Sequence, residues 1–446
     1  MHPASNRSRD HHGSTPNIST QAAESGMSRA LHLCRKPDCP EGVDPDVFRA
    51  FTRTGKVAGS AMDIAGIAVW AIKNSEEAAL QALLDGGEKH LDLACRDLNA
   101  GDARILAHAL EANTTLCSLR LGMNRLGSEG ATLIAAALAE HPALLELDLG
   151  SNRIAPDGFE AIAALLEKNS CLLALNLESN EAGCEGTGLI AQALLKNNVL
   201  TSLNLVGNCI GSDGAEYIAI MLAANTALAV LSLGANEIEP EGGMFIAAML
   251  EKNTTLKRLH AGFNAIGPVS ANAIFAAASV NGSLESLDLA GNELDHGCGA
   301  AIGALLQRNR TLTSLDLRAN RMGVNDDATR MAFTEAVVSG LDGNTVLTTL
   351  HLGFNHLDGY LNHATPATLR GRIPDLLNRN RTLEALSKKD AYACSQMLPG
   401  VPTPLDVGGV MAAAMIMAAP DTAAHARMMV EVHCAVNLLA PQAEPQ

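Results

Sequence analysis

The chain has 446 residues, of which 47% are hydrophobic and only 3% aromatic, and its formal net charge at pH 7 is −16. This acidity argues against nucleic acid as a partner, because phosphate backbones are bound by basic surfaces. It is compatible with a basic protein partner, and it also keeps a large protein soluble. The scarcity of aromatic residues predicts a core of leucine, isoleucine and alanine.

The N-terminal part of the chain is polar. Residues 1–28 are rich in serine and poor in apolar side chains, so we expect a disordered leader. They contain no apolar run of the kind found in secretory signal peptides. The stretch that follows is broken by prolines and predicts no regular element. We therefore assign residues 1–56 to a disordered leader and an irregular segment.

Two helices are expected next. Residues 60–73 are almost entirely apolar. Asn74 is the predicted N-cap of a second helix, with Glu77 as its capping-box partner and Gly86–Gly87 at its end. Residues 57–87 should therefore form a helical N-terminal cap that covers the apolar face of the first repeat.

From residue 88 onward one pattern recurs, Leu-x-x-Leu-x-Leu-x-x-Asn-x-Leu, mostly with a period of 28 residues. The alternating leucines predict one short strand per copy, with its leucines turned inward. The asparagine comes where the chain turns away, and its amide can satisfy backbone groups of the neighbouring copy. The first copy has Arg96 instead. We expect the asparagines to stack as a ladder: Asn124, Asn152, Asn180, Asn208, Asn236, Asn264, Asn292, Asn320 and, after a longer step of 35 residues, Asn355.

A helical stretch follows each strand. In residues 127–144 the apolar side chains of Ala131, Ile134, Ala135 and Leu138 share one face, which should cover the strand. A strand and a helix cannot bury their apolar faces alone, so the core must form by stacking of repeats. A second set of asparagines recurs where these helices end, and we expect it to cap them in the left-handed conformation. This set comprises Asn169, Asn197, Asn225, Asn253, Asn281, Asn309, Asn344 and Asn380.

These copies, for example residues 113–138, resemble the ribonuclease-inhibitor-like class of leucine-rich repeats, whose period is about 20 to 29 residues. The resemblance covers residues 88–386, about ten repeats. It implies a right-handed α/β horseshoe, with a parallel sheet on the concave face and helices on the convex face. The class also occurs in NOD-like receptors, the Ran GTPase-activating protein and bacterial effectors such as the GALA family. No nucleotide-binding domain is present, which excludes a complete NOD-like receptor.

The C-terminal repeats depart from the strict period. One insertion lies near residues 323–331 and another around residues 359–372. Insertions in solenoids map to surface loops, often on a binding face; the alternative is a C-terminal end that drifts from the pattern. Residues 387–446 lose the repeat, and their longest apolar run, of 12 residues, is too short to span a bilayer. We expect a helical C-terminal cap there and no membrane segment.

The chain has ten cysteines, and the six within the repeats lie at scattered positions of the period, which indicates a reducing cytosol rather than disulfides; these six are Cys95, Cys117, Cys171, Cys184, Cys209 and Cys298. Cys34 and Cys39 could bind zinc, but no second pair lies nearby. We therefore expect no metal and no other cofactor. His433 and Cys434 are adjacent on an expected helix and so point apart, which disfavours a nucleophile beside its base.

The residue between the two strand leucines faces outward, into the curve. Neighbouring strands lie about 4.8 Å apart, so Arg120 should pair with the carboxylates on either side. His260–Asp288 and Asp316–His351 are adjacent pairs that could do acid–base work. However, the two histidines are three strands apart, roughly 14 Å, and no serine or cysteine nucleophile lies obviously beside either pair. We therefore expect neither a catalytic site nor an enzyme. The whole row is Asp92, Arg120, Asp148, Asn176, Asn204, Ser232, His260, Asp288, Asp316 and His351.

Phe263 and Phe354 follow two of these strands and should be exposed on the same face; the alternative is that they pack into the turn. Aromatic and arginine side chains are typical interface anchors. Together with Arg258 they make the C-terminal half of the concave face the expected contact region for a protein partner. The candidate residues are Arg258, His260, Phe263, Asp288, Asp316, His351 and Phe354.

These features predict a monomeric, non-enzymatic protein-interaction scaffold. The serine-rich leader resembles type III secretion leaders, which implies a bacterial effector that is cytoplasmic when made and is delivered into the host cytosol. One alternative is a GTPase-activating protein of the Ran-activator type, although the C-terminal tail lacks the acidity of that family. The other is a ubiquitin-ligase substrate adaptor, because residues 44–51 are similar to part of an F-box.

Overall fold

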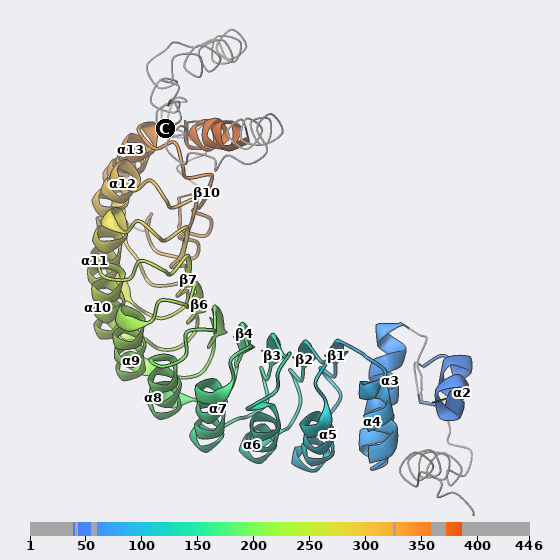
Figure 1. The fold of residues 1–446 in the computed structure, drawn as a ribbon. Coiled ribbons are helices and arrows are strands. Elements are labelled where there is room, and N and C mark those ends of the chain that lie inside the picture. The colour runs from blue at the N-terminus through green and yellow to red at the C-terminus, as the bar shows by residue number, and fades with distance from the viewer. Residues whose placement is uncertain (1–38, 41–42, 55–59, 324–326, 358–371, 386–446) are drawn as a thin grey trace, which may run out of the picture. The chain divides into compact units, whose positions relative to one another are not determined.

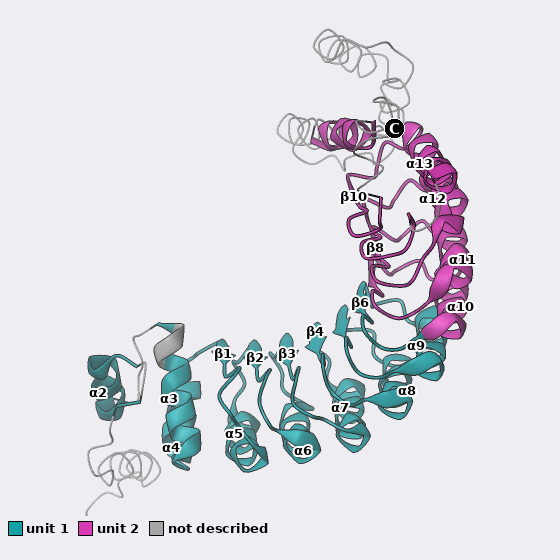
Figure 2. Cartoon of the chain, turned by 180° about the vertical axis from the view of Figure 1, so that it is seen from behind, with its two compact units in different colours: residues 1–238 teal, residues 239–446 magenta. Residues whose placement is uncertain are grey.

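The protein divides into two compact units, Met1–Ile238 and Glu239–Gln446 (Figure 2). Each unit is built from repeats of one strand and one helix, coloured in chain order in Figure 1. The computed structural model describes residues 39–40, 43–54, 60–323, 327–357 and 372–385.

Unit 1 begins with helices α2 (Pro45–Thr54), α3 (Ala61–Lys73) and α4 (Glu77–Asp85). Helix α2 lies in the stretch for which the prolines predict an irregular segment. Its Phe48 and Phe51 are buried, and the Phe48 ring meets Trp70 of α3 edge to face, with 5.1 Å between the ring centroids. A helix as short as α2 is not stable alone, and this aromatic contact with α3 stabilises it.

The connection between α3 and α4 differs from the prediction. Helix α4 has Gly86 as its C-cap, and Gly87 follows with a φ of 86°, as expected. Its N-cap residue, however, is Glu76, which makes no side-chain capping bond. Asn74 instead donates its side-chain amide to the Trp70 carbonyl at the end of α3. The predicted N-cap at Asn74 is therefore wrong, because the preceding helix holds this side chain.

The described part of unit 1 continues with six parallel strands, each paired with the next without offset, so that leucine lies beside leucine. The strands are β1 (His90–Asp92), β2 (Ser118–Arg120), β3 (Glu146–Asp148), β4 (Ala174–Asn176), β5 (Ser202–Asn204) and β6 (Val230–Ser232). The helices of these repeats lie side by side behind the strands (Figure 1). They are α5 (Ala100–Ala112), α6 (Gly127–Leu138), α7 (Pro156–Lys168), α8 (Gly183–Leu194) and α9 (Gly211–Ala224).

Unit 2 repeats this arrangement. Its parallel strands are β7 (Arg258–His260), β8 (Ser286–Asp288), β9 (Ser314–Asp316) and β10 (Thr349–His351). Its helices are α10 (Glu239–Leu250), α11 (Gly267–Val280), the short η1 (His296–Cys298), α12 (Gly299–Arg308), α13 (Asp327–Asp342) and one over residues 372–385. The insertion near residues 323–331 contains the start of α13. The second insertion, apart from residue 372, and the predicted C-terminal cap lie outside the described residues.

The core of each unit consists of strand leucines and one face of each helix. In α6 the predicted residues Ala131, Ile134, Ala135 and Leu138 are all buried. Gly130 lets the neighbouring helix approach, since a Cβ there would lie 3.3 Å from the Cβ of Ala103. The predicted α/β solenoid, with a parallel sheet on one face and helices on the other, is confirmed in each unit.

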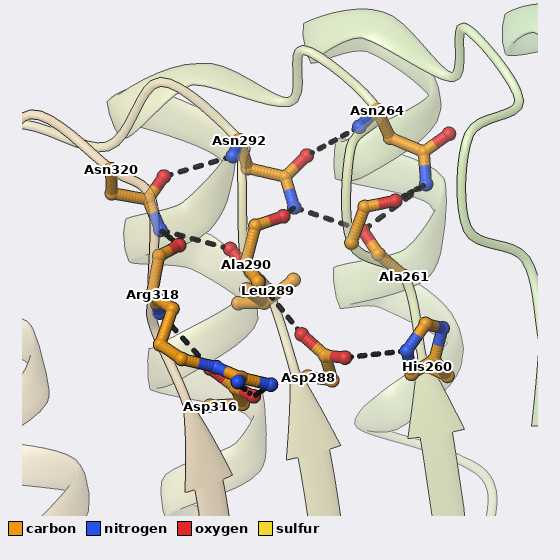
Figure 3. A network of polar contacts seen from close by, with 11 residues as sticks. His260, Ala261, Asn264, Asp288, Leu289, Ala290, Asn292, Asp316, Arg318 and Asn320 are labelled. Carbon is orange, nitrogen blue, oxygen red and sulfur yellow. Dashed lines mark hydrogen bonds and ion pairs between the residues drawn. The ribbon is translucent and has the colours of Figure 1, made fainter. Parts of the chain in front are cut away.

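The asparagines after the strands are buried and hydrogen-bonded between repeats. Asn208 is 0% exposed. Its Nδ2 donates to the carbonyl of Leu177 in the preceding repeat (2.9 Å) and to that of Leu205 in its own (3.1 Å). Its Oδ1 accepts from the amide of Ala182 (3.3 Å). Figure 3 shows the same arrangement in unit 2, where the backbone amide of Asn292 donates to the side-chain Oδ1 of Asn320.

The asparagines at the helix ends do not adopt the predicted left-handed conformation. Asn169 is extended, with φ −73° and ψ 127°. Its Oδ1 accepts from the amides of Cys171 and Leu172, and its Nδ2 donates to the Leu138 carbonyl of the preceding repeat. The chain must run straight from the helix into the next strand, so the side chain, not a left-handed turn, satisfies the free backbone groups. These residues form a second ladder.

His141 takes the place of asparagine in this second ladder. Its Nδ1 lies 3.3 Å from the amide nitrogen of Ala143 and 3.2 Å from that of Leu144. Nδ1 is therefore an acceptor, which assigns the ring proton to Nε2, facing the Asn113 Oδ1 at 3.3 Å. Burial lowers the pKa of His141 below 6.5, so the folded state holds the ring neutral.

This arrangement predicts that His141 destabilises the fold in acid. A group with a lowered folded pKa contributes stability above its unfolded pKa, and that stability is lost as the pH falls through the folded value. We expect His141→Asn to be more stable than the wild type at about pH 5, by on the order of 1 kcal/mol, and equally stable at about pH 8. Urea unfolding at both pH values measures this difference. His90→Asn, at an exposed histidine of the same unit, should show no such change. Equal pH dependence in wild type and His141→Asn would rule out this role.

Candidate interaction surface

The outward-facing residues of β7–β10, with the residues directly after each strand, form a surface that we call the sheet face of unit 2. The strand register places His260, Asp288, Asp316 and His351 in one row across it. Arg258 lies on the same face, two residues before His260, because side chains alternate along a strand. The two histidines lie on β7 and β10, three strands apart, as the sequence predicts.

His260 and Asp288 form a close pair, with 2.6 Å between the His260 Nε2 and the Asp288 Oδ2 (Figure 3). The other carboxylate oxygen accepts from the Ala290 amide at 2.8 Å. The hydrogen bond to Asp288 raises the pKa of His260 above 6.5, although partial burial lowers it. Burial raises the pKa of Asp288, but the hydrogen bonds from His260 and Ala290 outweigh this and leave it below its ordinary value.

The pair should stabilise the fold over a defined pH range. The contribution of His260 is complete below its unfolded pKa of about 6.5 and is lost as the pH rises through its raised folded pKa. We expect Asp288→Asn to cost up to about 1 kcal/mol at about pH 6 and less at about pH 9, as measured by urea unfolding. The matched control is Asp213→Asn in unit 1, an exposed carboxylate. A cost for Asp288→Asn that does not vary between the two pH values would contradict the ion pair.

Asp316 is bound differently from the prediction. Its carboxylate accepts from Arg318, with 2.9 Å from Nε to Oδ2 and 2.6 Å from Nη2 to Oδ2 (Figure 3). Among the described residues, His351 makes no ion pair with Asp316, although the two are in register. Arg318 follows β9, two residues after Asp316, and its Nε and Nη2 reach both carboxylate oxygens as a fork. Arg318 is a further charged residue of this face that was not predicted, although its spacing of two residues from Asp316 indicates the same face.

Phe263 and Phe354 are exposed, at 62% and 78% respectively. Each directly precedes a ladder asparagine and has a φ of 59°, in the left-handed region. A bulky side chain there costs on the order of 1–3 kcal/mol. The two intervening repeats have small residues at this position, Gly291 and Ala319, and the Phe263 ring lies against Gly291, where a Cβ would be 2.4 Å from Cδ1.

Arg258 is exposed and, within the described part of the chain, has no ion-pair partner. Its neighbour Lys257 pairs with Glu285 at 3.2 Å. Because Asp288 and Asp316 bind His260 and Arg318 within the chain, they hold those side chains in place. Of the predicted residues, those that remain open to a partner are therefore Arg258, His351 and the two phenylalanines.

On the strands of unit 1, only half of the predicted ion-pair row forms. Arg120 approaches Asp92, with 3.9 Å between Nη1 and Oδ2. On the other side the Asp148 carboxylate accepts from the Asn176 side-chain amide at 2.8 Å and from the Gly150 amide at 2.9 Å. These two donors hold the carboxylate, and no ion pair to Arg120 forms in this described segment.

The described residues contain no group of three or more histidine, cysteine or acidic side chains arranged to hold a metal ion. Cys34 lies outside them, and the Cys39 thiol donates to the Val43 carbonyl. Burial raises the pKa of Cys298 to about 12, so this thiol is protonated and unreactive at neutral pH. Across the described helices, none is both long enough and apolar enough to cross a membrane.

The family model described as "Leucine Rich repeat" matches residues 112–135, 141–163, 196–219, 308–325 and 343–359. These segments all fall within the strand-and-helix repeats. The chain is a leucine-rich-repeat protein. No curated protein matches it.

Several solved structures are similar to this leucine-rich-repeat protein. TLR13, solved as a complex with ssRNA13, is 20% identical with a TM-score of 0.38, and the match covers 64% of this chain and 34% of TLR13. The actin-binding site 2 of leiomodin-1 is 23% identical with a TM-score of 0.26, covering 44% of this chain and 91% of that one. The tropomodulin C-terminal domain of Caenorhabditis elegans is 13% identical with a TM-score of 0.29, covering 45% and 98%. The chain thus spans about a third of TLR13, and these likenesses concern the fold alone.

Proposed function

We propose that this protein is a non-enzymatic scaffold that binds a protein partner through the sheet face of unit 2. The observation that carries the proposal is the pair Phe263 and Phe354. Both rings are exposed, and both residues hold a left-handed backbone that costs free energy. Exposed rings return little of that cost in the isolated protein, whereas aromatic side chains supply much of the free energy of binding when a partner covers them.

The charges of this face support a protein partner over a nucleic acid. Lys257, His260 and Arg318 each have a carboxylate partner within the chain. Arg258 is left as the cation free to bind an acidic group, among the described residues of β7–β10. Nucleic-acid binding depends on many cations that neutralise phosphates. One free arginine on the same face as two exposed rings instead fits a partner surface with apolar side chains and a carboxylate.

The His260–Asp288 pair supports a binding role over catalysis. A histidine base acts on a nucleophile or substrate within hydrogen-bond distance. In the described structure the hydrogen-bond partner of His260 is Asp288 alone. We propose that the pair, like Arg318 with Asp316, fixes the shape and charge of the surface before the partner arrives, which lowers the entropic cost of binding.

The finer proposal is a bacterial effector that acts in a host cytosol. It rests on the composition of residues 1–28, which lie outside the described part. The adaptor alternative is disfavoured, because Phe48 and Phe51 of the F-box-like stretch are buried within unit 1. No feature of the described residues argues against the GTPase-activating alternative, and a GTP-hydrolysis assay tests it directly.

The experiment is affinity capture from host-cell lysate by the full chain, with Phe263→Ala/Phe354→Ala as the paired variant. A host protein retained by the wild type and lost by the variant supports the proposal. Acceleration of GTP hydrolysis by a captured GTPase would favour the Ran-activator alternative. Co-purification of a Skp1-type adaptor would favour the ubiquitin-ligase alternative. Equal capture by wild type and variant would show that the sheet face of unit 2 is not the contact surface.

A further inference from the structure

Unit 1 has a second surface of interest on its helix side, away from the strands. A groove of about 430 Å³ runs between α8 and α9. Its apolar lining includes Leu195, Tyr217 and Ile220, which are 48%, 45% and 56% exposed. These are three of the large hydrophobic side chains that unit 1 exposes, and all three border the same groove. Scattered exposed leucines need no explanation, but a gathered set marks an interaction site.

The sequence of the two helices builds this groove. In α8, Gly188 has no side chain, so the Tyr217 ring of α9 lies over it; a Cβ there would be 3.2 Å from the ring Cδ2. Helix α9 buries its inner face in the core and also carries exposed Tyr217, Ile220, Ala223 and Ala224 on its outer face. An outer helix face on which large apolar side chains gather is normally covered by another surface.

The neighbouring helix α7 shows what an ordinary outer face looks like in this unit. Its exposed residues include Glu160, Glu167 and Lys168. The contrast shows that stacking of repeats does not require an apolar outer face. The outer face of α9 therefore has a cause outside the packing of unit 1.

The rim of the groove is acidic. Glu185 borders it directly, and Asp213 and Glu216 lie on α9 beside Tyr217. None of the three has an ion-pair partner among the described residues. The nearby cation Lys196 is already paired with Glu167, at 2.8 Å. Two copies of this surface facing each other would bring like charges together, which disfavours a second copy of the chain as the occupant.

We infer that the groove binds an amphipathic helix of a partner protein, whose apolar face fills the groove and whose flanks carry lysine or arginine. This is the helix-in-groove mode, in which residues spaced three and four apart supply the anchors. The rim carboxylates select for basic flanks by charge complementarity. The site lies on the helices of unit 1 and is independent of the function proposed for the strands of unit 2.

The test uses two fluorescein-labelled peptides of about 18 residues, each with leucine along one helical face. One carries lysine and the other glutamate on the remaining positions. Fluorescence anisotropy with the full chain measures both affinities. We expect the leucine/lysine peptide to bind at least ten-fold more tightly than the leucine/glutamate peptide. Tyr217→Ala/Ile220→Ala should weaken the leucine/lysine peptide at least ten-fold, and Glu185→Lys/Glu216→Lys should reverse the preference.

Matched controls separate the groove from general stickiness and general charge. Leu145→Ala/Leu173→Ala removes two exposed leucines elsewhere in unit 1, and Glu140→Lys/Glu160→Lys makes the same charge change outside the groove. Urea unfolding of each variant confirms that it is folded. The inference is overturned if the wild type binds neither peptide, or if the control pairs weaken binding as much as the groove pairs. It is also overturned if the wild type dimerises in sedimentation and the Tyr217→Ala/Ile220→Ala protein does not, because the groove would then hold a second copy.

Discussion

Replacement of Asn208 by alanine is expected to lower the free energy of unfolding by roughly 1–3 kcal/mol. The variant removes the Nδ2 donor to the Leu177 and Leu205 carbonyls and the Oδ1 acceptor for the Ala182 amide. Asn208 is fully buried, so water cannot replace these hydrogen bonds at no cost. Chemical denaturation followed by circular dichroism measures the change.

The matched control for this prediction is Asn198→Ala, an exposed asparagine of the same unit, which should change stability by less than about 0.5 kcal/mol. Asn208→Asp keeps the shape and the acceptor but loses the donor and buries a charge, so it should be at least as damaging as alanine. If Asn208→Ala unfolds at the same denaturant concentration as the wild type, the asparagine does not join the repeats.

Replacement of Arg258 and Phe263 together by alanine is expected to weaken partner binding ten-fold or more, which corresponds to about 1.4 kcal/mol or above. Arg258 and Phe263 lie on the same repeat, both exposed and free of intramolecular ion pairs in the described structure. Because neither side chain supports the core, the melting temperature should stay nearly unchanged. Titration calorimetry with the captured partner and a thermal melt give the two values.

The control for the binding prediction is a pair of exposed residues in unit 1. Met123 occupies the same left-handed position as Phe263 and is 67% exposed, and Arg153 is an exposed arginine nearby in sequence. Met123→Ala/Arg153→Ala should leave the affinity unchanged. Intact affinity in the Arg258→Ala/Phe263→Ala protein, with loss in the control or after substitutions on the helices, would move the contact surface elsewhere.

Periodicity made the fold predictable from the sequence alone. A repeated spacing fixes where each strand begins, and parallel strands of identical repeats pair without offset, so Leu119 lies beside Leu147 as the alignment of copies requires. The same spacing placed His260 beside Asp288. Such predictions hold because every repeat makes the same contacts with its neighbours. An error in placing one strand therefore does not change the placement of the next.

Predictions of individual hydrogen-bond partners were less secure. Register placed Asp316 beside both Asp288 and His351, but Arg318, two residues after the end of the same strand, binds its carboxylate. Asn169 looked like a left-handed cap, yet its side chain satisfies the backbone and leaves the chain extended. Sequence spacing gives the neighbourhood of a side chain, whereas side-chain length and donor geometry select the partner within it.

The groove on α8 and α9 was missed for a different reason. The helical spacing of apolar residues indicates only the inward face of a helix, and α9 has this spacing in Ile218, Ala219 and Leu222. Its outer face carries Tyr217 and Ile220, where polar residues are expected. These additional apolar residues are the feature of the sequence that indicates the groove. The role of Gly188, which makes room for the Tyr217 ring, is clear only from the structure.

The direction of the ladder bonds bears on how a chain of this kind can change its length. Each asparagine reaches back to the repeat before it, as when Asn180 donates to the Leu149 carbonyl and accepts from the Ile154 amide. Excision of residues 181–208, one whole period, would bring Asn236 to the same Leu177 carbonyl that Asn208 now holds. Gene duplication or loss in whole periods therefore preserves every junction, while a deletion one residue longer or shorter turns the inward leucines outward. The number of repeats in unit 1 can therefore change during evolution without any change in the hydrogen bonds between neighbouring repeats.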